Sequence, residues 1–369
     1  MIFMISRSPA EDFNDGYYHF GKDLATYPDA GMYVVWSRRG PGKTYSFLRY
    51  CTDCEFFFIY VKRTNDDVDL ICTGADNPDL KADLDPFVPL NRDFGWNIKP
   101  KLIKKGIAAF YEFDEEGKPV GAPIGMLISL SRVKSVKGMD LSRARFICFD
   151  EFIPQATEIV RRNEGEAFAD FIMTVMRDKA KRHQKLQVVL FANAEDISTP
   201  ITNAFDLVDD MADMSFKKLS HYYNRERRIL LHHITQAEIP LSDEELHSDM
   251  FCMMKGTAWA QKAFFGDFVN NDFSNVKKLS VKNMECVHKI IYKNKKFYIY
   301  RRPSDNMHYM TSSRGPYKYE WDLNRENDQK LFWIEHAQEL RVECIQDNMK
   351  FEKYSMYDLI INYKKFFEV

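Results

Sequence analysis

The sequence lacks the features that mark several classes of protein. Its 369 residues carry 52 basic and 54 acidic side chains, a net charge of −2, so the chain is not a polycation that coats nucleic acid over its whole surface. No apolar run approaches the ~20 residues that a membrane-spanning helix needs, and the N-terminus lacks the basic-then-apolar pattern of a signal peptide. Internal repeats and low-complexity segments are also absent. We therefore expect a cytosolic protein without a membrane partner, in which any contact with nucleic acid comes from a local patch.

Cysteine is sparse and irregularly spaced. There are seven cysteines, an odd number without the regularity of a disulfide framework, which fits a reducing compartment. Cys51 and Cys54 form a C-x-x-C pair, but a zinc ribbon needs a second pair and the sequence has none. We do not expect a zinc or redox site there.

Size and composition favour a folded protein with a substantial core. At about 150 residues for a domain, the chain length corresponds to roughly two domains. A hydrophobic share of 45% and a charged share of 29% are typical of globular rather than disordered chains. Acidic residues gather at 66–85 and basic residues at 177–185, and such runs are most often solvated faces.

The stretch Ser37 to Thr44, which we name the Gly-rich loop, stands between an apolar run at 32–36 and a helix-like run at 45–50. Strand, loop and helix therefore follow in the order that a phosphate-binding loop needs. The glycines let backbone N–H groups turn toward a phosphate, Lys43 can reach the β and γ oxygens, and the Thr44 hydroxyl can hold Mg²⁺. Ser37 departs from the pattern, which has glycine at this position. The predicted nucleotide-binding residues are Ser37, Arg38, Arg39, Gly40, Pro41, Gly42, Lys43, Thr44 and Tyr45.

Two further strands end in polar side chains. The apolar run 146–149 is followed by Asp150 and Glu151, which places both acids at the carboxyl edge of a buried strand, where open α/β sheets bind ligands. Hydrolysis of a phosphoanhydride needs one acid for the Mg²⁺ shell and another to orient or deprotonate water, and we assign Asp150 and Glu151 to these roles. The run 186–191 leads to Asn193, which is placed to sense a γ-phosphate or the attacking water.

The remaining pattern alternates between strands and helices up to residue 216. A strand at 55–61 ends in Lys62 and Arg63, a hairpin is expected at 107–130, and a helix at 164–181 carries Arg177 near its end. Beyond residue 216 a basic stretch at 221–233 reads as helical and an acidic one follows at 238–249. The tail combines short antiparallel strands near 287–292, 296–301 and 307–310 with two helices at about 328–342 and 355–366. We therefore predict an α/β domain at 1–216, a linker at 217–249 and a β-rich α+β domain at 250–369.

Three motifs follow one another along the chain: the Gly-rich loop, the run from Phe146 to Glu151, and Ala192 to Ala194. In this order they resemble the DNA-packaging ATPases of tailed phages, and above all the small packaging motors of φ29-like phages. Proteins of that family often carry an arginine inside the loop and tolerate serine at its first position, which fits Arg39 and Ser37. The resemblance covers the first ~215 residues well and the rest only loosely.

This resemblance implies a fold, a function and partners. The fold would be a P-loop NTPase domain of the ASCE type, with a RecA-like sheet and flanking helices, then a small linker and a degenerate RNase H-like domain. The protein would form a pentameric ring on the portal of an empty procapsid, in the host cytoplasm and outside the mature virion. This ring would drive double-stranded DNA inward with ATP and Mg²⁺. A packaging RNA is a further candidate partner. Arg177 matches an arginine finger supplied in trans, and Lys137 matches a basic residue that reaches the neighbour's nucleotide.

A packaging motor must accept any sequence, so its DNA contacts should be to phosphates alone. We name Lys62, Arg63, Arg161 and Arg162 as candidates for these contacts.

Other functions remain open on sequence alone. Asn193 and Asp196 have the N-x-x-D spacing of a GTPase, but the expected lysine and a D-x-x-G motif are missing. A helicase-like hydrolase, a nucleotide kinase and a non-catalytic nucleotide-gated scaffold are further alternatives. A nuclease in the tail would need three or four clustered carboxylates, whereas those of the tail are scattered: Asp267, Asp272, Asp305 and Asp322.

Overall fold

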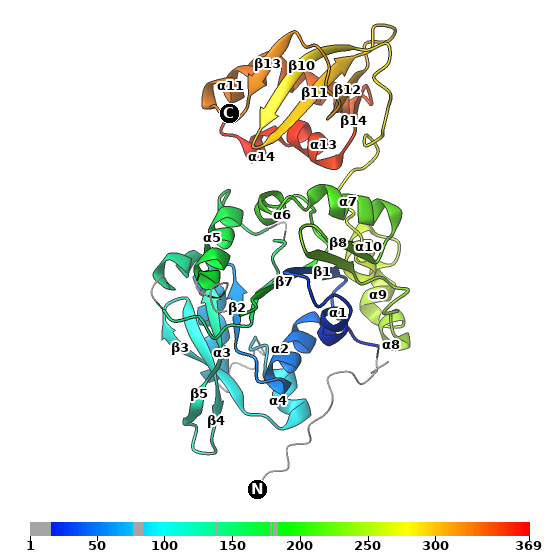
Figure 1. Ribbon diagram of the computed structural model, residues 1–369. Helices are drawn as coiled ribbons and strands as arrows, with labels where there is room; N and C mark the ends of the chain where they lie inside the picture. Colours follow the sequence, from blue (N-terminus) through cyan, green and yellow to red (C-terminus); the bar gives the residue numbers. More distant parts are fainter. Residues whose placement is uncertain (1–15, 77–83, 137–138, 156, 178, 180–183) are drawn as a thin grey trace. The chain divides into compact units, whose positions relative to one another are not determined.

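The computed structural model describes residues 16–76, 84–136, 139–155, 157–177, 179 and 184–369. Within these ranges, no helix combines the length and the apolar character needed to cross a membrane. The chain divides into two compact units, residues 1–205 with 217–269 and residues 206–216 with 270–369. Each unit has its own sheet, blue through green in the first and yellow to red in the second (Figure 1).

The first unit is organised by a nine-stranded sheet in the order β3-β4-β5-β2-β6-β7-β1-β9-β8. Its six central strands run parallel: β5 (Pro119–Ser129), β2 (Phe58–Lys62), β6 (Phe146–Asp150), β7 (Gln187–Asn193), β1 (Met32–Ser37) and β9 (Ile229–His233). The other strands pair antiparallel at the two edges: β3 (Ile98–Lys104), β4 (Ile107–Phe113) and β8 (His221–Asn224). The central strands are nearly continuous apolar runs, as expected for strands buried on both faces.

Helices cover both faces of this sheet because alternate strand residues point to opposite sides. On one face, α1 (Phe20–Thr26) and α2 (Lys43–Asp53) bring Phe20 and Phe47 against Phe146. On the other, α5 (Glu164–Met176) packs Phe168 on Phe149, with ring centroids 5.3 Å apart. The other helices among the described residues of this unit are α3 (Asn65–Asp76), α4 (Val88–Phe94), the 3₁₀ helix Leu130–Val136, α6 (Pro200–Ala204), α8 (Asp243–Leu246), α9 (Asp249–Met254) and α10 (Ala258–Phe265).

The second unit has a five-stranded sheet in the order β13-β10-β11-β12-β14. The predicted antiparallel strands are β10 (Glu285–Tyr292), β11 (Lys295–Arg301) and β12 (His308–Thr311), and β13 (Tyr319–Asp322) and β14 (Met349–Phe351) extend the sheet by parallel pairing. The predicted helices are α11 (Glu326–Phe332), a π-helical turn at Trp333–Ala337, α12 (Gln338–Ile345), α13 (Tyr354–Ile361) and α14 (Tyr363–Phe366). Helix α7 (Val208–Lys217) also belongs largely to this unit, where Asp209 accepts hydrogen bonds from the backbone N–H and hydroxyl of Ser355.

Several sequence-based expectations are corrected by the structure. The stretch 221–233 is not a helix: it forms the hairpin β8–β9, and all five residues of β9 are buried beside β1. The residues expected to form a linker, 217–249, lie in the first unit. The hairpin expected at 107–130 is confirmed as β4–β5, whereas the helix α1 and the edge strand β3 have no counterpart among the predicted elements.

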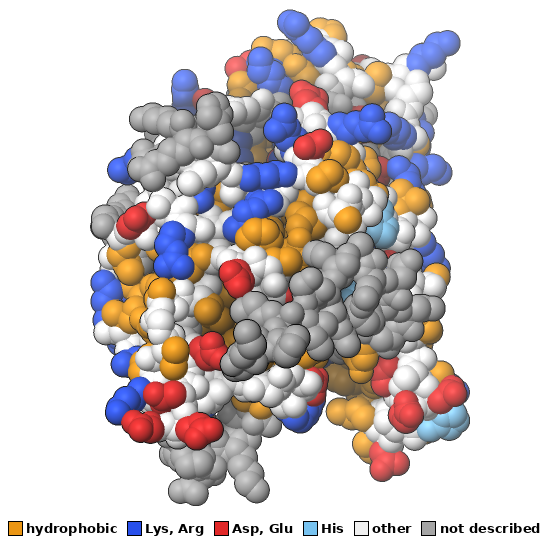
Figure 2. Space-filling model, turned by 60° about the horizontal axis from the view of Figure 1, so that its bottom comes forward, with side chains coloured by type: hydrophobic (Ala, Val, Ile, Leu, Met, Phe, Trp, Pro, Cys, Tyr) orange, Lys and Arg blue, Asp and Glu red, His pale blue; other side chains and the backbone are white. Residues whose placement is uncertain are grey.

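Figure 2 shows the distribution of charged side chains on one face of the molecule. On the face displayed in Figure 2, acidic, basic and apolar side chains are interspersed, with small acidic groups near the lower edge. This mixture agrees with a net charge near zero.

Candidate functional site

The Gly-rich loop connects the end of β1 to the start of α2. Gly40 and Gly42 have φ angles of +95° and +83°, the left-handed region that only glycine enters without strain. Ser37 is instead the last residue of β1 and is not among the residues with positive φ. The first position of the loop therefore does not need glycine here, which explains why serine is tolerated.

Lys43 lies buried inside the loop. Its Nζ donates to Ser37 Oγ at 2.5 Å, to the Arg38 carbonyl at 3.3 Å and to Asn193 Oδ1 at 3.4 Å. The Ser37 hydroxyl in turn donates to the Arg38 carbonyl at 2.5 Å. Burial lowers the pKa of Lys43 to about 8, so its charge is costly to keep without a partner and favourable to pair with an anion.

The two acids follow β6 and share one cation. Asp150 accepts hydrogen bonds from the Tyr60 hydroxyl and from Lys62 Nζ, the latter at 3.3 Å, and Lys62 Nζ also lies 3.0 Å from Glu151 Oε2. Burial by itself would raise the pKa of Asp150, but Lys62 and Tyr60 bring it below its ordinary value. Glu151 has a φ of +57°, a strained conformation for a non-glycine residue, and its side chain is 51% exposed.

A cavity of about 340 Å³ joins these groups. Its lining runs from Arg39 to Tyr45 and continues with Asp150, Glu151, Ala192 and Asn193. A second cavity of about 670 Å³ shares Thr44, Asp150 and Glu151 with the first and extends past Lys62. The predicted Lys43, Thr44, Asp150, Glu151 and Asn193 thus meet at the carboxyl ends of β1, β6 and β7, as the pattern of polar residues after strands indicated.

Some predicted residues lie elsewhere or have other partners. The Arg38 guanidinium is buried and bonded to Glu245, outside the lining of the cavity. Arg63 is also buried, and it bonds Glu164, Glu158 and the carbonyls of Glu151 and Phe152. These bonds fix the turn that carries the acids, and a buried guanidinium engaged in this way is not available for the predicted contact with DNA.

Three of the remaining basic candidates line neither cavity: Arg161, Arg162 and Arg177. Arg177 is exposed at the end of α5, and Arg161 and Arg162 are exposed just before that helix begins. Lys137 lies outside the described residues. Lys62 remains close to the acids and is committed to them in this structure.

The geometry also bears on the alternative functions. The asparagine of the N-x-x-D spacing is directed to the Gly-rich loop, since Asn193 Oδ1 accepts a hydrogen bond from Lys43. Glu195, two residues on, pairs with Lys262 at 2.8 Å. In the second unit the structure describes no group of three metal-ligating side chains: Asp305 pairs with Arg302 and Asp322 with Arg325.

One group among the described residues has metal-like spacing, namely Asp23, His221 and His232, whose ligand atoms lie within 4.8 Å of one another. His232 Nδ1 bonds Asp23 directly at 2.8 Å, and its Nε2 bonds Glu238 at 3.0 Å. Both ring nitrogens are therefore occupied by carboxylates, which is the arrangement of a buried ion pair rather than of a metal centre.

Sequence reasoning missed the partners that support the site. Tyr60 and Lys62 are two residues apart in β2, so they lie on the same face of this strand, which pairs with β6. This spacing is the one local signal that could have linked them to Asp150. Glu164 and Glu245 give no such signal, because their arginine partners are more than a hundred residues away in the chain.

Comparisons with known proteins place this arrangement in a family. The family model of the Podovirus DNA encapsidation protein (Gp16) matches residues 105–352, well over half of the chain, although the Gly-rich loop precedes that range. The bacteriophage Phi-29 viral genome packaging motor assembly contains a chain with 18% identity and a TM-score of 0.62, over 95% of this chain and 99% of that one. The Phi-28 gp11 DNA packaging motor gives 15% identity and a TM-score of 0.60, over 96% and 98%. No curated protein sequence matches significantly. These structural likenesses show a shared mixed α/β fold, and the family match shows that the chain belongs to the Podovirus DNA encapsidation protein (Gp16) family of phage packaging-motor proteins.

Proposed function

We propose that the protein is an ATP-driven translocase that packages double-stranded phage DNA into a procapsid through its portal. The observation that carries this proposal is the convergence of Lys43, Thr44, Asp150, Glu151 and Asn193 on one cavity. Each has the chemistry that hydrolysis of a bound nucleotide needs, and they come from three strand ends far apart in the sequence.

The sheet order supports an ASCE-type, RecA-like P-loop domain. Strand β7 lies between β1, which leads into the Gly-rich loop, and β6, which ends in the paired acids. The inserted strand brings Asn193 beside Lys43. On this basis we assign Asn193 to positioning the attacking water or sensing the γ-phosphate.

The residues present fit Mg²⁺ and a nucleoside triphosphate. A Cβ on Gly40 would come within 3.3 Å of the Arg38 guanidinium, so a side chain there would crowd the cradle, and the loop glycines leave its backbone open to phosphate. Thr44 and Asp150 present hard oxygen atoms on the same cavity, and they would hold Mg²⁺, which supplies charge neutralisation to the phosphates when bound. Lys43 then pairs its ammonium with the terminal phosphates. Glu151, half exposed at the cavity, takes the proton of the attacking water once it separates from Lys62.

Arg177 suits a role toward a neighbouring copy. It is exposed at the end of α5 and lines neither cavity of its own chain, so it is placed to complete another subunit's site. We propose a homo-oligomeric ring, with five subunits, ATP at the interfaces and Lys137 as a second basic group in trans. The proposed partners are the portal, a packaging RNA and the phosphate backbone of DNA, in the host cytoplasm during assembly.

The second unit we propose to be a degenerate RNase H-like domain that binds DNA or the portal. Three antiparallel strands with β13 parallel to the first of them support this assignment. Its described carboxylates are paired with arginines or dispersed, which supports loss of nuclease chemistry.

The test is ATP turnover by the wild type and by Glu151→Gln, with and without duplex DNA. We expect DNA to stimulate the wild type, and Glu151→Gln to lose turnover by ~10² or more, because the variant cannot accept the water proton. Glu166→Gln, an exposed change on α5, is the matched control and should keep wild-type rates. Full turnover in Glu151→Gln would rule out the assigned base, and no turnover by the wild type would favour the nucleotide-gated scaffold.

A further inference from the structure

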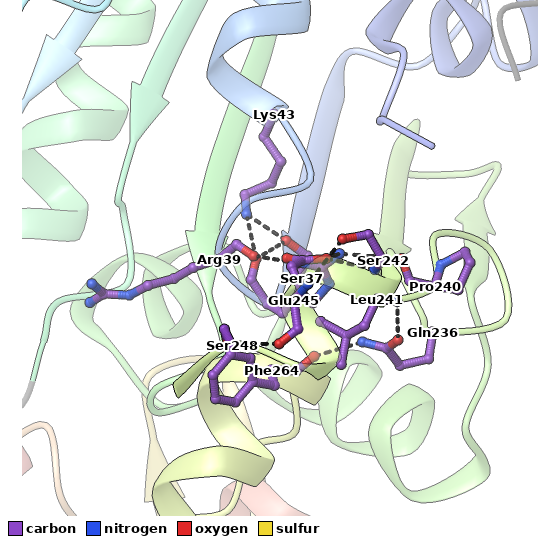
Figure 3. A network of polar contacts seen from close by, with 11 residues as sticks. Ser37, Arg39, Lys43, Gln236, Pro240, Leu241, Ser242, Glu245, Ser248 and Phe264 are labelled. Carbon is purple, nitrogen blue, oxygen red and sulfur yellow. Dashed lines mark hydrogen bonds and ion pairs between the residues drawn. The ribbon is translucent and has the colours of Figure 1, made fainter. Parts of the chain in front are cut away.

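The Gly-rich loop is held from behind by a segment that the sequence did not connect with it. Residues 236–266, which we name the bracing segment, follow β9 and contain α8, α9 and α10. Figure 3 shows residues of this segment, among them Gln236, Glu245 and Phe264, gathered beneath Ser37 and Lys43. The segment is tied to itself by Gln236, which donates to the Phe264 carbonyl at 2.6 Å and accepts from the Leu241 N–H at 2.9 Å.

Arg38 is the main link between the loop and this segment. Its guanidinium binds Glu245 in a bidentate manner, Nη1 to Oε1 at 2.6 Å and Nη2 to Oε2 at 3.1 Å. It also donates to the carbonyls of Arg39 at 2.9 Å and Pro240 at 3.4 Å. The arginine side chain is only 7% exposed, whereas that of Glu245 is 38% exposed. The two loop arginines thus differ: Arg38 is bound inside this network, and Arg39 points away from it in Figure 3 and lines the cavity.

Glu245 is itself fixed by a second bond. It is the third residue of α8 and closes the capping box of that helix, so its carboxylate accepts the Ser242 N–H at 2.9 Å while the Ser242 hydroxyl accepts the Glu245 N–H at 3.1 Å. The Ser242 N–H thus fixes Oε2, one of the two carboxylate oxygens that bond the planar guanidinium. Glu245 therefore fixes the position of the Arg38 side chain. That side chain bonds the Arg39 carbonyl, and Lys43 bonds the Arg38 carbonyl, so both loop carbonyls are held as well.

Two backbone contacts bring the same segment against the loop. The Arg39 N–H donates to the Ala263 carbonyl at 3.4 Å. Gly266 has a φ of +72°, and a Cβ there would lie 2.6 Å from the Arg38 nitrogen and 2.9 Å from the Ser37 carbonyl carbon. Only glycine allows this approach, so the loop rests directly on the backbone of the bracing segment.

We propose that Arg38 is a positioning residue, which acts through Glu245 to hold the Gly-rich loop in the form that accepts nucleotide phosphates. The inference rests on the proposed nucleotide site. The physical reason is that a buried guanidinium without its carboxylate must either stay unpaired or turn, and turning moves the Arg39 carbonyl and the loop with it. Glutamine also serves in a capping box, so Glu245→Gln removes the charge and keeps the cap.

The experiment measures the Kd of a fluorescent ATP analogue in the presence of Mg²⁺. The proteins compared are the full-length wild type, Arg38→Met, Glu245→Gln and the double variant. We expect each single change to raise the Kd about tenfold, and the double variant to lose no more than the worse single change, since both changes break one interaction. Glu244→Gln, the exposed neighbour on α8, is the matched control and should bind like the wild type. Thermal melting without nucleotide, measured in parallel, should place all variants in the folded state.

The outcomes separate the two proposals. A wild type that binds no ATP analogue would refute the proposed function itself. If the wild type binds, a Kd for Glu245→Gln equal to that of Glu244→Gln would overturn the role of Arg38, and so would a double variant whose loss is the product of the single losses. Should Arg38→Met fail to fold, the comparison of Glu245→Gln with Glu244→Gln decides alone.

Discussion

Lys62 is the residue that most constrains the paired acids. Its ammonium lies 3.3 Å from Asp150 and 3.0 Å from Glu151, and the Lys62 side chain is 15% exposed. Burial alone would lower the pKa of Lys62, but the two acids raise it above its ordinary value, so the cation persists at any working pH. The same pairing keeps the buried Asp150 ionised, the state in which a carboxylate can hold Mg²⁺.

We predict that Lys62→Met moves the acid limb of ATP turnover upward by about one pH unit. Without the ammonium, burial raises the pKa of Asp150 unopposed, so Asp150 binds a proton at a higher pH as the solution is acidified. The measurement is kcat/KM for ATP between pH 5 and 9. Lys101→Met, an exposed change on β3, should leave the profile unchanged. An unaltered acid limb in Lys62→Met would contradict the prediction.

At the scale of elements, His232 joins three parts of the first unit. It stands in β9 and bonds Asp23 of α1 and Glu238 of the turn after β9, while Tyr18 donates to the same Asp23 at 2.9 Å. Burial alone would lower the pKa of His232, but the two carboxylates raise it from 6.5 to about 9. Burial alone would raise the pKa of Asp23, and the histidines lower it to about 2.

The sign of the pH dependence follows from these directions. Because the folded-state pKa of His232 exceeds its unfolded value, the stabilisation is complete below about pH 6.5 and is lost as pH rises through about 9. We predict that His232→Asn lowers the free energy of unfolding by about 2 kcal/mol at pH 6, and by clearly less at pH 9.5. Urea unfolding at several pH values measures this, with the exposed His247→Asn as control. A deficit that stays constant with pH would exclude a charged His232.

Elements with strong local patterns could be predicted from the sequence, and those set by distant pairing could not. The runs of β1, β6 and β7 are apolar and end in polar residues, which located Lys43, Asp150 and Asn193 at one edge. The stretch 221–233 is predicted as helical because its charged residues outweigh the short apolar run of β9 in the pattern. Parallel pairing with β1 decides the conformation of this run. Arg38 was predicted as a nucleotide ligand because its position in the loop is local information, whereas its partner Glu245 is 207 residues away.

For the whole molecule, we have proposed that Arg177 of one copy completes the nucleotide site of its neighbour. Within the described residues, the cavity contains Arg39 and Lys43, while Arg177 lies outside both cavities on the exposed end of α5. An arginine that stabilises the transition-state charge is worth ~10³ or more in rate, so a ring that shares it between subunits gains both activity and communication. A shared site has a consequence that a private site lacks: two inactive variants can restore one another.

We predict that Arg177→Ala and Lys43→Ala are each nearly inactive, and that mixing them restores ATP turnover. An interface works when a subunit with an intact Gly-rich loop meets a neighbour with an intact Arg177, which in random equal mixing is the case for about a quarter of interfaces. Turnover should therefore peak near equal proportions and vanish at both ends of the mixing series. Lys43→Ala mixed with Glu151→Gln is the matched control. Each of these variants has lost the nucleotide site of its own chain and has kept Arg177, so no interface in the mixture has a working site. Restoration in that control would mean that the site is not divided as proposed, and no restoration with Arg177→Ala at any ratio would return Arg177 to its own chain.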